Sequence, residues 1–147
     1  DIMTNKIKIN IKYFNNECKI KKIKKGDWID LRSAINKEYN KGDFFLIPLG
    51  IAMQLPKNYE AHIAPRSSTF KNYGILQTNS VGIIDESYRG DDDQWFFSAF
   101  ACKDGKITKG DRICQFRIIE KMPKILFIEK NKFGSENRGG HGSTGIK

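Results

Sequence analysis

The sequence has only three cysteines and two histidines among its 147 residues. Cys18, Cys102 and Cys114 are odd in number, widely spaced and without any C-x-x-C pair, which argues against a disulfide framework and a zinc site. We expect all three to be buried thiols. Two histidines are too few for a His-rich catalytic metal site, so any metal ion should be a hard cation with oxygen ligands.

Long apolar runs are also missing. The longest, at 44–55, is interrupted by Pro48, Gly50 and Gln54 and is too short to span a bilayer. The N-terminus lacks the basic start, apolar run and small-residue cleavage site of a secretory signal. We therefore expect a cytoplasmic protein with no membrane partner. Its 39% hydrophobic and 29% charged residues are typical of one globular domain.

The net charge is +9, and much of the excess lies in lysines at 19, 21, 22, 24 and 25, around Ile20 and Ile23. Clustered lysines can bind a nucleic-acid backbone. They can also form a solvated strand face or turn, or a field that speeds encounter with a small anion. We favour the solvated face and expect no nucleic-acid partner.

Alternating hydrophobicity predicts a β protein. Apolar residues at 7, 9, 11 and 13 alternate with polar ones, as in a half-buried strand. Further short β-type runs lie at 28–31, 44–48, 51–55, 60–64, 81–84, 95–102, 113–119 and 125–129, mostly separated by Gly or Pro. Only 68–73 favours a helical turn, capped by Ser68 or Thr69 and ended by Gly74. Many short strands predict an all-β sandwich or jelly roll.

The C-terminal segment differs in composition from the rest. From Gly134 onward it is rich in glycine and has almost no apolar side chains, so it cannot build a core. We predict a β domain at 1–133 and a mobile tail at 134–147.

The segment P-R-S-S-T at 65–69 places Arg66 and the hydroxyls of Ser67, Ser68 and Thr69 beside a possible helix N-terminus. Free backbone N–H groups and the helix dipole favour an anion there, so the segment fits a phosphate cradle. A capped turn with an exposed arginine is the alternative.

Residues 79–90 predict a β-hairpin or bulged strand that brings an acid, an aromatic and an amide together. Asp85 follows Ile83 and Ile84, and partial desolvation would raise its proton affinity and suit it to take a proton from water. The alternative is an aspartate that begins a turn.

Two later segments are ambiguous by themselves. Residues 109–116 predict a turn and a strand, in which Gln115 is an uncharged polar side chain that can contact a ligand. Asp111 and Arg112 fit a structural ion pair as well as a binding site. Residues 138–145 lack the lysine of a Walker A loop. Their glycines can form an anion nest or simply a flexible tail.

In order and spacing these segments resemble the five motifs of the trimeric dUTPases, of a Gram-positive bacterial or phage-like subgroup. The matching stretches are D-W-I-D-L-R-S at 27–33, P-R-S-S-T at 65–69, G-I-I-D-E-S-Y-R-G at 82–90, G-D-R-I-C-Q-F at 110–116 and G-G-H-G-S-T-G at 139–145. The resemblance implies a distorted jelly-roll β-barrel in a homotrimer, with active sites at subunit boundaries. It also implies hydrolysis of dUTP to dUMP and pyrophosphate with Mg²⁺, limiting uracil in DNA and supplying dUMP for dTMP synthesis.

The resemblance also assigns roles in phosphate chemistry. Asp85 would deprotonate the water that attacks the α-phosphorus. Arg66 would reach the triphosphate, Ser67 and Ser68 its bridging oxygens, and Gln115 the α-phosphate, stabilising charge that develops in the transition state.

Further roles concern the metal and the nucleoside. Asp30 would hold metal-bound water or order the site, and no direct protein ligand is expected because Mg²⁺ keeps several waters and binds substrate phosphates. Asn79, Gly82 and the amide of Ile84 would read uracil, and Tyr88 would pack on the deoxyribose.

The fifth motif would supply Arg138, Ser143 and Thr144 to the substrate, with two departures from the family pattern. His141 stands where the family has an aromatic, most often Phe, that closes over uracil. Arg138 lies three residues before it, whereas the family arginine lies five before.

The three aromatics at 95–97 offer a substitute for the missing one. In a strand Trp95 and Phe97 would point one way and Phe96 the other. We predict that Phe96 covers the base, with His141 as the other candidate lid. The alternative is that all three are core or trimer-contact residues.

Two other functions remain open at this point. A dCTP deaminase is a relative in fold, although the third motif and G-S-T-G favour the diphosphatase. A basic nucleic-acid-binding or regulatory phage protein is the other, and a repressor-type protein partner is compatible with the sequence.

Overall fold

The computed structural model describes residues 6–21, 25–142 and 144–146. It is almost entirely β, with one short helix, α1 (Thr69–Tyr73), and one 3-10 turn, η2 (Asn16–Cys18). The strands are β1 (Asn10–Tyr13), β2 (Ile29–Arg32), β3 (Lys37–Tyr39), β4 (Phe44–Pro48), β5 (Ile51–Gln54), β6 (Tyr59–Pro65), β7 (Ile75–Gln77), β8 (Gly82–Ile84), β9 (Phe96–Ala101), β10 (Gly105–Ile107) and β11 (Arg112–Glu120).

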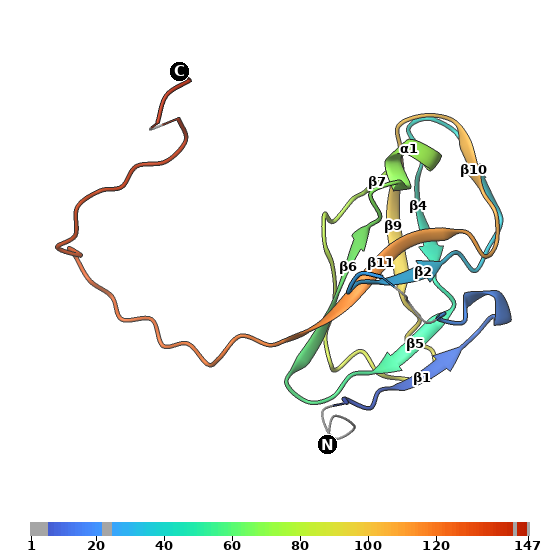
Figure 1. The fold of residues 1–147 in the computed structure, drawn as a ribbon, viewed down its shortest axis with the longest axis horizontal. Helices are drawn as coiled ribbons and strands as arrows, with labels where there is room; N and C mark the ends of the chain where they lie inside the picture. The colour runs from blue at the N-terminus through green and yellow to red at the C-terminus, as the bar shows by residue number, and fades with distance from the viewer. Residues whose placement is uncertain (1–5, 22–24, 143, 147) are drawn as a thin grey trace.

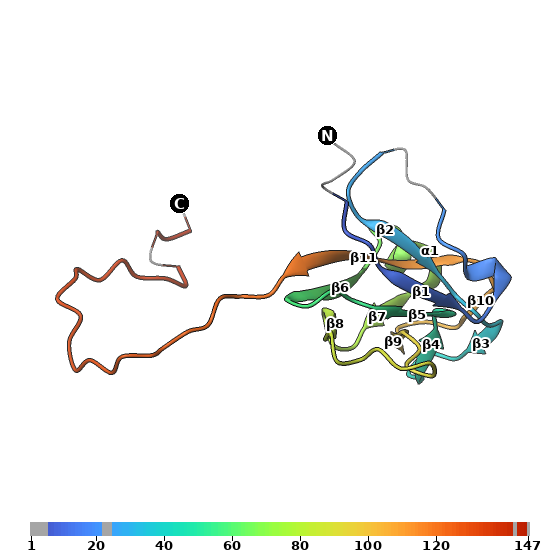
Figure 2. The same ribbon diagram turned by 90° about the horizontal axis from the view of Figure 1, so that it is seen from below.

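The strands form four antiparallel sheets around one core (Figures 1 and 2). The largest has the order β2-β11-β6-β8 and the next β4-β9-β7, while β1-β5 and β10-β3 are strand pairs. Neighbouring strands are far apart in sequence, as when β11 pairs with both β2 and β6. This is the distorted jelly-roll barrel that the sequence predicts.

The core is built by alternating side chains of the central strands. Trp95 and Phe97 are completely buried, and the Trp95 ring meets Phe116 of β11 edge-on, with centroids 5.3 Å apart. Phe96 between them is exposed. The predicted alternation of these three aromatics is confirmed, because strand side chains point to opposite faces in turn.

All predicted strands but one are present, β4 with the predicted ends and the others with shifted ends. The exception is 125–129, which the structure leaves outside any strand. Its apolar composition suits a strand, but a ladder needs a neighbouring backbone, and no part of the described chain pairs with it. The sequence pattern does not predict three strands of the structure, β3, β7 and β10. Each has three residues and exists only through pairing with a distant strand.

Two local predictions are wrong. Ser68 makes no capping hydrogen bond at α1, and the Thr69 hydroxyl is bonded to the Arg66 amide instead. Of the two alternatives for residues 79–90, the hairpin is wrong, because the strand within them, β8, pairs with β6. The helix end is as predicted, since Gly74 adopts φ 65° and its amide bonds to the Phe70 carbonyl.

The cysteine prediction holds for Cys18 and Cys114, which are buried, but is wrong for Cys102, which is half-buried.

Within the basic segment, Lys22, Ile23 and Lys24 lie outside the described residues. Neither helical segment of the described chain has the length and apolar character needed to cross a membrane.

The barrel ends at Lys121, whose amide donates to the carbonyl of Asn58 over 2.9 Å. Beyond it the described residues of 122–146, here called the C-terminal arm, run away from the barrel (Figures 1 and 2). Every described residue of the arm is exposed. The arm therefore leaves the barrel before residue 134, where the composition changes.

Candidate active site

The first part of the candidate site is an ion-pair cluster on the four-stranded sheet. Arg66, just after β6, lies with Nε 3.2 Å from Asp30 Oδ1, and Arg112 NH1 of β11 lies 3.2 Å from Asp30 Oδ2. Gln115 is in register with Asp30, and its Nε2 donates to the Pro65 carbonyl over 3.0 Å. The structure thus brings together Asp30, Arg66 and Gln115. With Arg112 we call them the arginine cluster.

Arg112 is a member that the sequence left ambiguous. It pairs with Asp30 rather than with Asp111, whose Oδ2 accepts the Thr108 amide over 2.9 Å. The register of β11 against β2 shifts between Arg112 and Cys114. Such a bulge re-aims a side chain, so simple strand alternation does not place Arg112 beside Gln115.

The charge of the arginine cluster suits an anion. One carboxylate, Asp30, faces two guanidinium groups, which leaves net positive charge at a partly exposed surface. Each carboxylate oxygen of Asp30 is paired with a guanidinium group, so Asp30 fixes the position of the Arg66 side chain. Its predicted contact with metal-bound water stays a prediction.

Thr69 fixes the turn that carries Arg66. Its side chain is almost completely buried, and its Oγ1 donates to the carbonyl of Ile113 over 2.8 Å. The same oxygen accepts the amide of Arg66 over 2.8 Å. This hydroxyl therefore ties the arginine turn to β11 in two directions.

Replacing Thr69 by the isosteric valine should destabilise the fold by ~1–3 kcal/mol, because an amide and a carbonyl lose their partner in a buried site. Thr69→Ser is the matched control: it keeps the hydroxyl and loses one methyl, at about 0.8 kcal/mol. Urea denaturation of both variants measures the difference. A valine variant as stable as the serine variant would show that the hydroxyl does not hold the turn.

Ser67 and Ser68 stand in the same turn beside Arg66. Ser67 is exposed and Ser68 is half-buried. Since α1 has only five residues, its dipole contributes little there. Side-chain hydroxyls and the guanidinium group are thus the donors that this turn offers to an anion.

The second part of the candidate site is Asp85, directly after β8. One of its oxygens, Oδ1, accepts the Ser87 amide over 2.8 Å, and the other, Oδ2, lies 3.4 Å from Lys121 Nζ. The side chain is 58% exposed. Asp85 therefore presents an ordered carboxylate to solvent, where a water molecule can approach it.

The predicted rise in the proton affinity of Asp85 is wrong for this chain. Hydrogen bonds from the backbone and side chain of Ser87 are the main causes that lower the Asp85 pKa; desolvation opposes them, and Lys121 adds a smaller lowering effect. Ile83 and Ile84 do not desolvate the carboxylate, because it lies beyond the strand end in an exposed turn. The group is consequently held in its anionic form, ready to accept a proton.

Strand β8 carries the residues predicted to read a base. Gly82 is buried opposite Ile63 of β6, and a Cβ on it would lie 3.2 Å from the Ile63 Cβ. Ile84 is half-buried, and Asn79 is exposed in the preceding turn. Because β8 is at the edge of its sheet, one side of its backbone has no strand partner within the described residues. Backbone groups of an edge strand suit recognition of a flat polar ligand.

Tyr88 closes the same segment. Its ring packs against the core, and its hydroxyl donates to the carbonyl of Gln94 over 2.7 Å. Burial, followed by the charge of Asp93, raises the Tyr88 pKa, so the phenol stays neutral. The ring is thereby fixed as a rigid surface.

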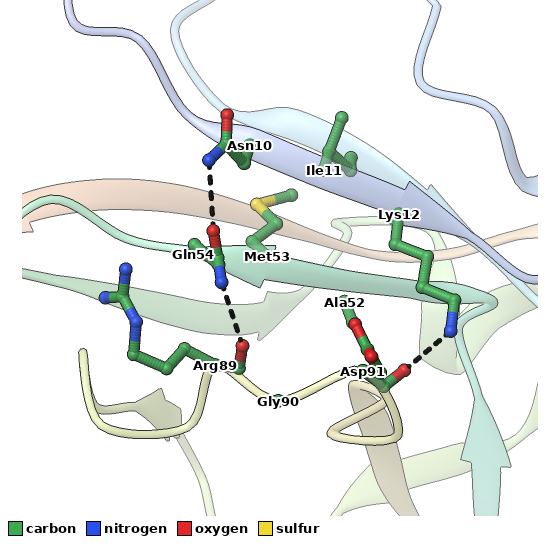
Figure 3. A pocket seen from close by; sticks show the side chains of 9 residues that line it. All are labelled: Asn10, Ile11, Lys12, Ala52, Met53, Gln54, Arg89, Gly90 and Asp91. Carbon is green, nitrogen blue, oxygen red and sulfur yellow. Dashed lines mark hydrogen bonds between the residues drawn. The ribbon is translucent and has the colours of Figure 1, made fainter.

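The loop after Tyr88 borders a pocket of about 190 Å³ that is lined by the strand pair β1-β5 and by residues 89–91 of the loop itself (Figure 3). In Figure 3 Asn10 donates to Gln54, and Gln54 donates to the carbonyl of Arg89. Lys12 Nζ donates to the carbonyl of Asp91 over 3.0 Å. These contacts hold the loop, while Asp85 lies outside the pocket lining.

The two parts of the candidate site lie at opposite ends of β11. Gln115 pairs with Asp30 and Ala64 near the strand start, whereas Lys121, which contacts Asp85, follows the strand end. Asp85 follows Ile84, which pairs with Ala61 of β6, so about six residues of extended chain along β6, or about 20 Å, separate Asp85 from Arg66. Within one chain, Asp85 and the arginine cluster are therefore too far apart to act on the same atom.

The fifth motif lies on the C-terminal arm. Arg138, His141 and Thr144 are all exposed, and Ser143 lies outside the described residues. The structure of one chain does not bring these residues to Asp85 or to the arginine cluster (Figure 1). Their predicted substrate contacts stay predictions.

Phe96 lies on the outer face of the β4-β9-β7 sheet. It is in register with Pro48, and Phe44, Leu46 and Phe100 are exposed on the same face. This apolar environment suits a subunit contact, while the role of Phe96 as a base lid stays a prediction.

A model of the dUTPase family matches residues 29–145, a range that includes all five motifs except the first two residues of the first. The chain belongs to the dUTPase family. It is 58% identical over 142 residues to the SPbeta prophage-derived deoxyuridine 5'-triphosphate nucleotidohydrolase YosS of Bacillus subtilis. That alignment covers 96% of this chain and 100% of YosS.

Solved dUTPases share the fold of this family member. The dUTPase of Staphylococcus bacteriophage 80alpha, solved as a mutant with dUpNHpp, superposes with a TM-score of 0.74 at 16% identity, covering 95% of this chain and 99% of that one. A dUTPase mutant of phage phi11 of S. aureus, described with a structural Mg(II) ion, gives 0.70 at 14% identity, with 86% and 100% covered. At these identities the likeness shows the fold alone.

Proposed function

We propose that this dUTPase-family protein is a dUTP diphosphatase that hydrolyses dUTP to dUMP and pyrophosphate. The observation that carries the proposal is the pairing of an anionic, exposed Asp85 beside edge strand β8 with a cationic arginine cluster at the other end of β11. Attack of water on a phosphoanhydride needs a base that accepts the proton of the water and hydrogen-bond donors that stabilise the phosphate oxygens.

In the proposed reaction Asp85 accepts the proton of a water molecule as its oxygen attacks the α-phosphorus. The bond from that phosphorus to the bridging oxygen breaks, and pyrophosphate leaves. Arg66 and Gln115 donate to the phosphate oxygens, with the hydroxyls of Ser67 and Ser68 beside them. These donors are held in place before the substrate binds, which is how a site stabilises developing charge.

A complete site requires more than one chain, because a single chain keeps Asp85 and the arginine cluster about 20 Å apart. We therefore propose the homotrimer that the family resemblance implies. Two exposed apolar surfaces support assembly. One is the outer face of β4-β9-β7, with Phe44, Leu46, Leu76, Phe96 and Phe100, and the other is the arm, with Leu126, Phe127, Ile128 and Phe133.

In the trimer the arm would bring the fifth motif to a site on a neighbouring chain. Arg138, Ser143 and Thr144 would then contact the phosphates, through backbone amides of the glycine-rich stretch as well as side chains. His141 or Phe96 would close over the base, since stacking on an aromatic ring is worth ~1–3 kcal/mol.

Selectivity for uracil would come from β8. Asn79 and the amide of Ile84 would pair with the polar edge of the base, and the cytosine amino group would leave these groups unpaired. Tyr88, fixed by its bond to Gln94, would pack on the deoxyribose and exclude a 2′-hydroxyl.

Magnesium would enter with the triphosphate. Mg²⁺ keeps several waters and binds through substrate phosphates and one or two carboxylates. Asp30, the carboxylate of the arginine cluster, is the oxygen donor placed to hold a metal-bound water there. Bound in this way, the ion would neutralise phosphate charge during attack.

Pyrophosphate release measured with each deoxynucleoside triphosphate tests the proposal. We expect release from dUTP far above that from dCTP and dTTP, and its loss on removing Mg²⁺ with EDTA. Ammonia release from dCTP would instead support the deaminase alternative. Failure to release pyrophosphate from dUTP in the presence of Mg²⁺ would refute the function.

A further inference from the structure

Lys121 stands where the barrel ends and the C-terminal arm begins. Its backbone amide is bonded to Asn58, and its side chain turns back to the segment after β8. There Nζ lies 2.7 Å from Glu86 Oε1 and 3.4 Å from Asp85 Oδ2. One ammonium group thus bridges two adjacent carboxylates, one of them the proposed base.

Glu86 is itself fixed, so it can aim Lys121. Its Oε2 accepts the amide of Asn58 over 2.9 Å. Its backbone carbonyl accepts Arg89 NH1, which also donates to the carbonyl of Leu55. Glu86 is half-buried, and its carboxylate is shared between the Asn58 amide and the Lys121 ammonium. The position of the ammonium is therefore set by groups other than Asp85.

We propose that Lys121 is a positioning residue for catalysis, and that its ammonium group, aimed by Glu86, holds the Asp85 carboxylate in the orientation that accepts the proton of the attacking water. The inference rests on the proposed function, since it assigns Lys121 a part in dUTP hydrolysis. It also links Asp85, the proposed catalytic base, to Lys121, the residue at which the C-terminal arm leaves the barrel.

The geometry of Asp85 explains why such a residue is needed. The carboxylate is exposed beyond the end of β8, where its Oδ1 accepts the Ser87 amide. Lys121 restrains the other oxygen, and each carboxylate oxygen keeps a further lone pair for water. Misplacing a reacting group by about 1 Å can cost up to ~10²-fold in rate. A second restraint on an exposed base therefore has a measurable effect.

Lys121 also acts on the charge of the base. Lys8, Lys57 and Arg89 line one pocket together with Glu86 and Ser87 of the Asp85 turn, and Glu120 and Lys121 line a second one with Lys57. Among them Lys121 contributes to the lowered Asp85 pKa, after the bonds from Ser87. Removing its charge should therefore raise that pKa and move the acidic limb of kcat/KM to higher pH, because the base must be deprotonated.

The test compares Lys121→Met with Lys121→Arg in the full-length protein, by dUTP hydrolysis across pH. We expect kcat of the methionine variant to fall about 10-fold with little change in KM, and its acidic limb to move to higher pH. Lys121→Arg should recover most of the wild-type kcat and most of the wild-type pH profile, because it keeps a charged donor. Lys106→Met, which removes an exposed lysine of β10 at the other side of the barrel, should behave like the wild type (Figure 1).

Glu86→Gln covers the case in which Lys121→Met fails to fold, because it keeps Lys121 but removes the charge that aims it. A smaller loss of kcat would support the proposal, with an acidic limb that does not move to higher pH, because the variant keeps the Lys121 charge and removes a negative neighbour of Asp85. An unchanged kcat and pH profile in a folded Lys121 variant, beside an active wild type, would overturn it. A loss of kcat that Lys121→Arg does not recover, or that Lys106→Met also shows, would overturn the proposal too. An inactive wild type would refute the proposed function instead.

Discussion

Asp85→Asn should bind dUTP and hydrolyse it ~10²–10⁴-fold more slowly than the wild type, the range that a positioned base contributes. The amide is nearly isosteric with the carboxylate, but it cannot take the proton of the attacking water. The side chain is exposed, so the substitution leaves the core untouched. Pyrophosphate release under single-turnover conditions measures the rate, and calorimetric titration measures binding.

Asp92→Asn is the matched control. It makes the same chemical change at an exposed carboxylate seven residues away, outside the Asp85 turn. Its rate should stay close to that of the wild type. If the Asp85→Asn protein also hydrolysed dUTP at a near-normal rate, Asp85 would not be the base and the proposed chemistry would be wrong.

The sequence predicts the barrel better than it predicts individual turns. Apolar alternation determined the faces of the long strands, and Trp95 and Phe97 are buried as that period requires. The three-residue strands β3, β7 and β10 carry too short a pattern, and they form through pairing with strands distant in sequence. Residues 125–129 have the apolar character of a strand but no strand partner among the described residues, a situation that no local pattern can reveal.

The candidate site shows the same division. The motifs identified Asp30, Arg66 and Gln115, which the structure does bring together. The pairing of Arg112 with Asp30 depends on a bulge in β11, and the contact of Lys121 with Asp85 joins residues 36 positions apart. The lowered pKa of Asp85 was missed because apolar neighbours in sequence do not bury a side chain that lies beyond the strand end.

Mixing two inactive variants should restore activity if each site combines Asp85 of one chain with the arginine cluster of another. Asp85→Asn and Arg66→Ala each disable every site of their own homotrimers. Chains unfolded together and refolded in equal amounts form mixed trimers, in which about one quarter of the sites combine an intact Asp85 with an intact Arg66. Pyrophosphate release from the mixture should therefore approach a quarter of the wild-type rate.

Mixing Arg66→Ala with Gln115→Ala is the matched control. Both residues belong to the arginine cluster of one chain, where Gln115 is bonded to Pro65 beside Arg66. No mixed trimer then contains a site with both residues intact, so activity should stay low. If the first mixture also stayed inactive while forming trimers, Asp85 and Arg66 of the same chain would have to meet. That would require β11, which separates them by about 20 Å, to rearrange on assembly.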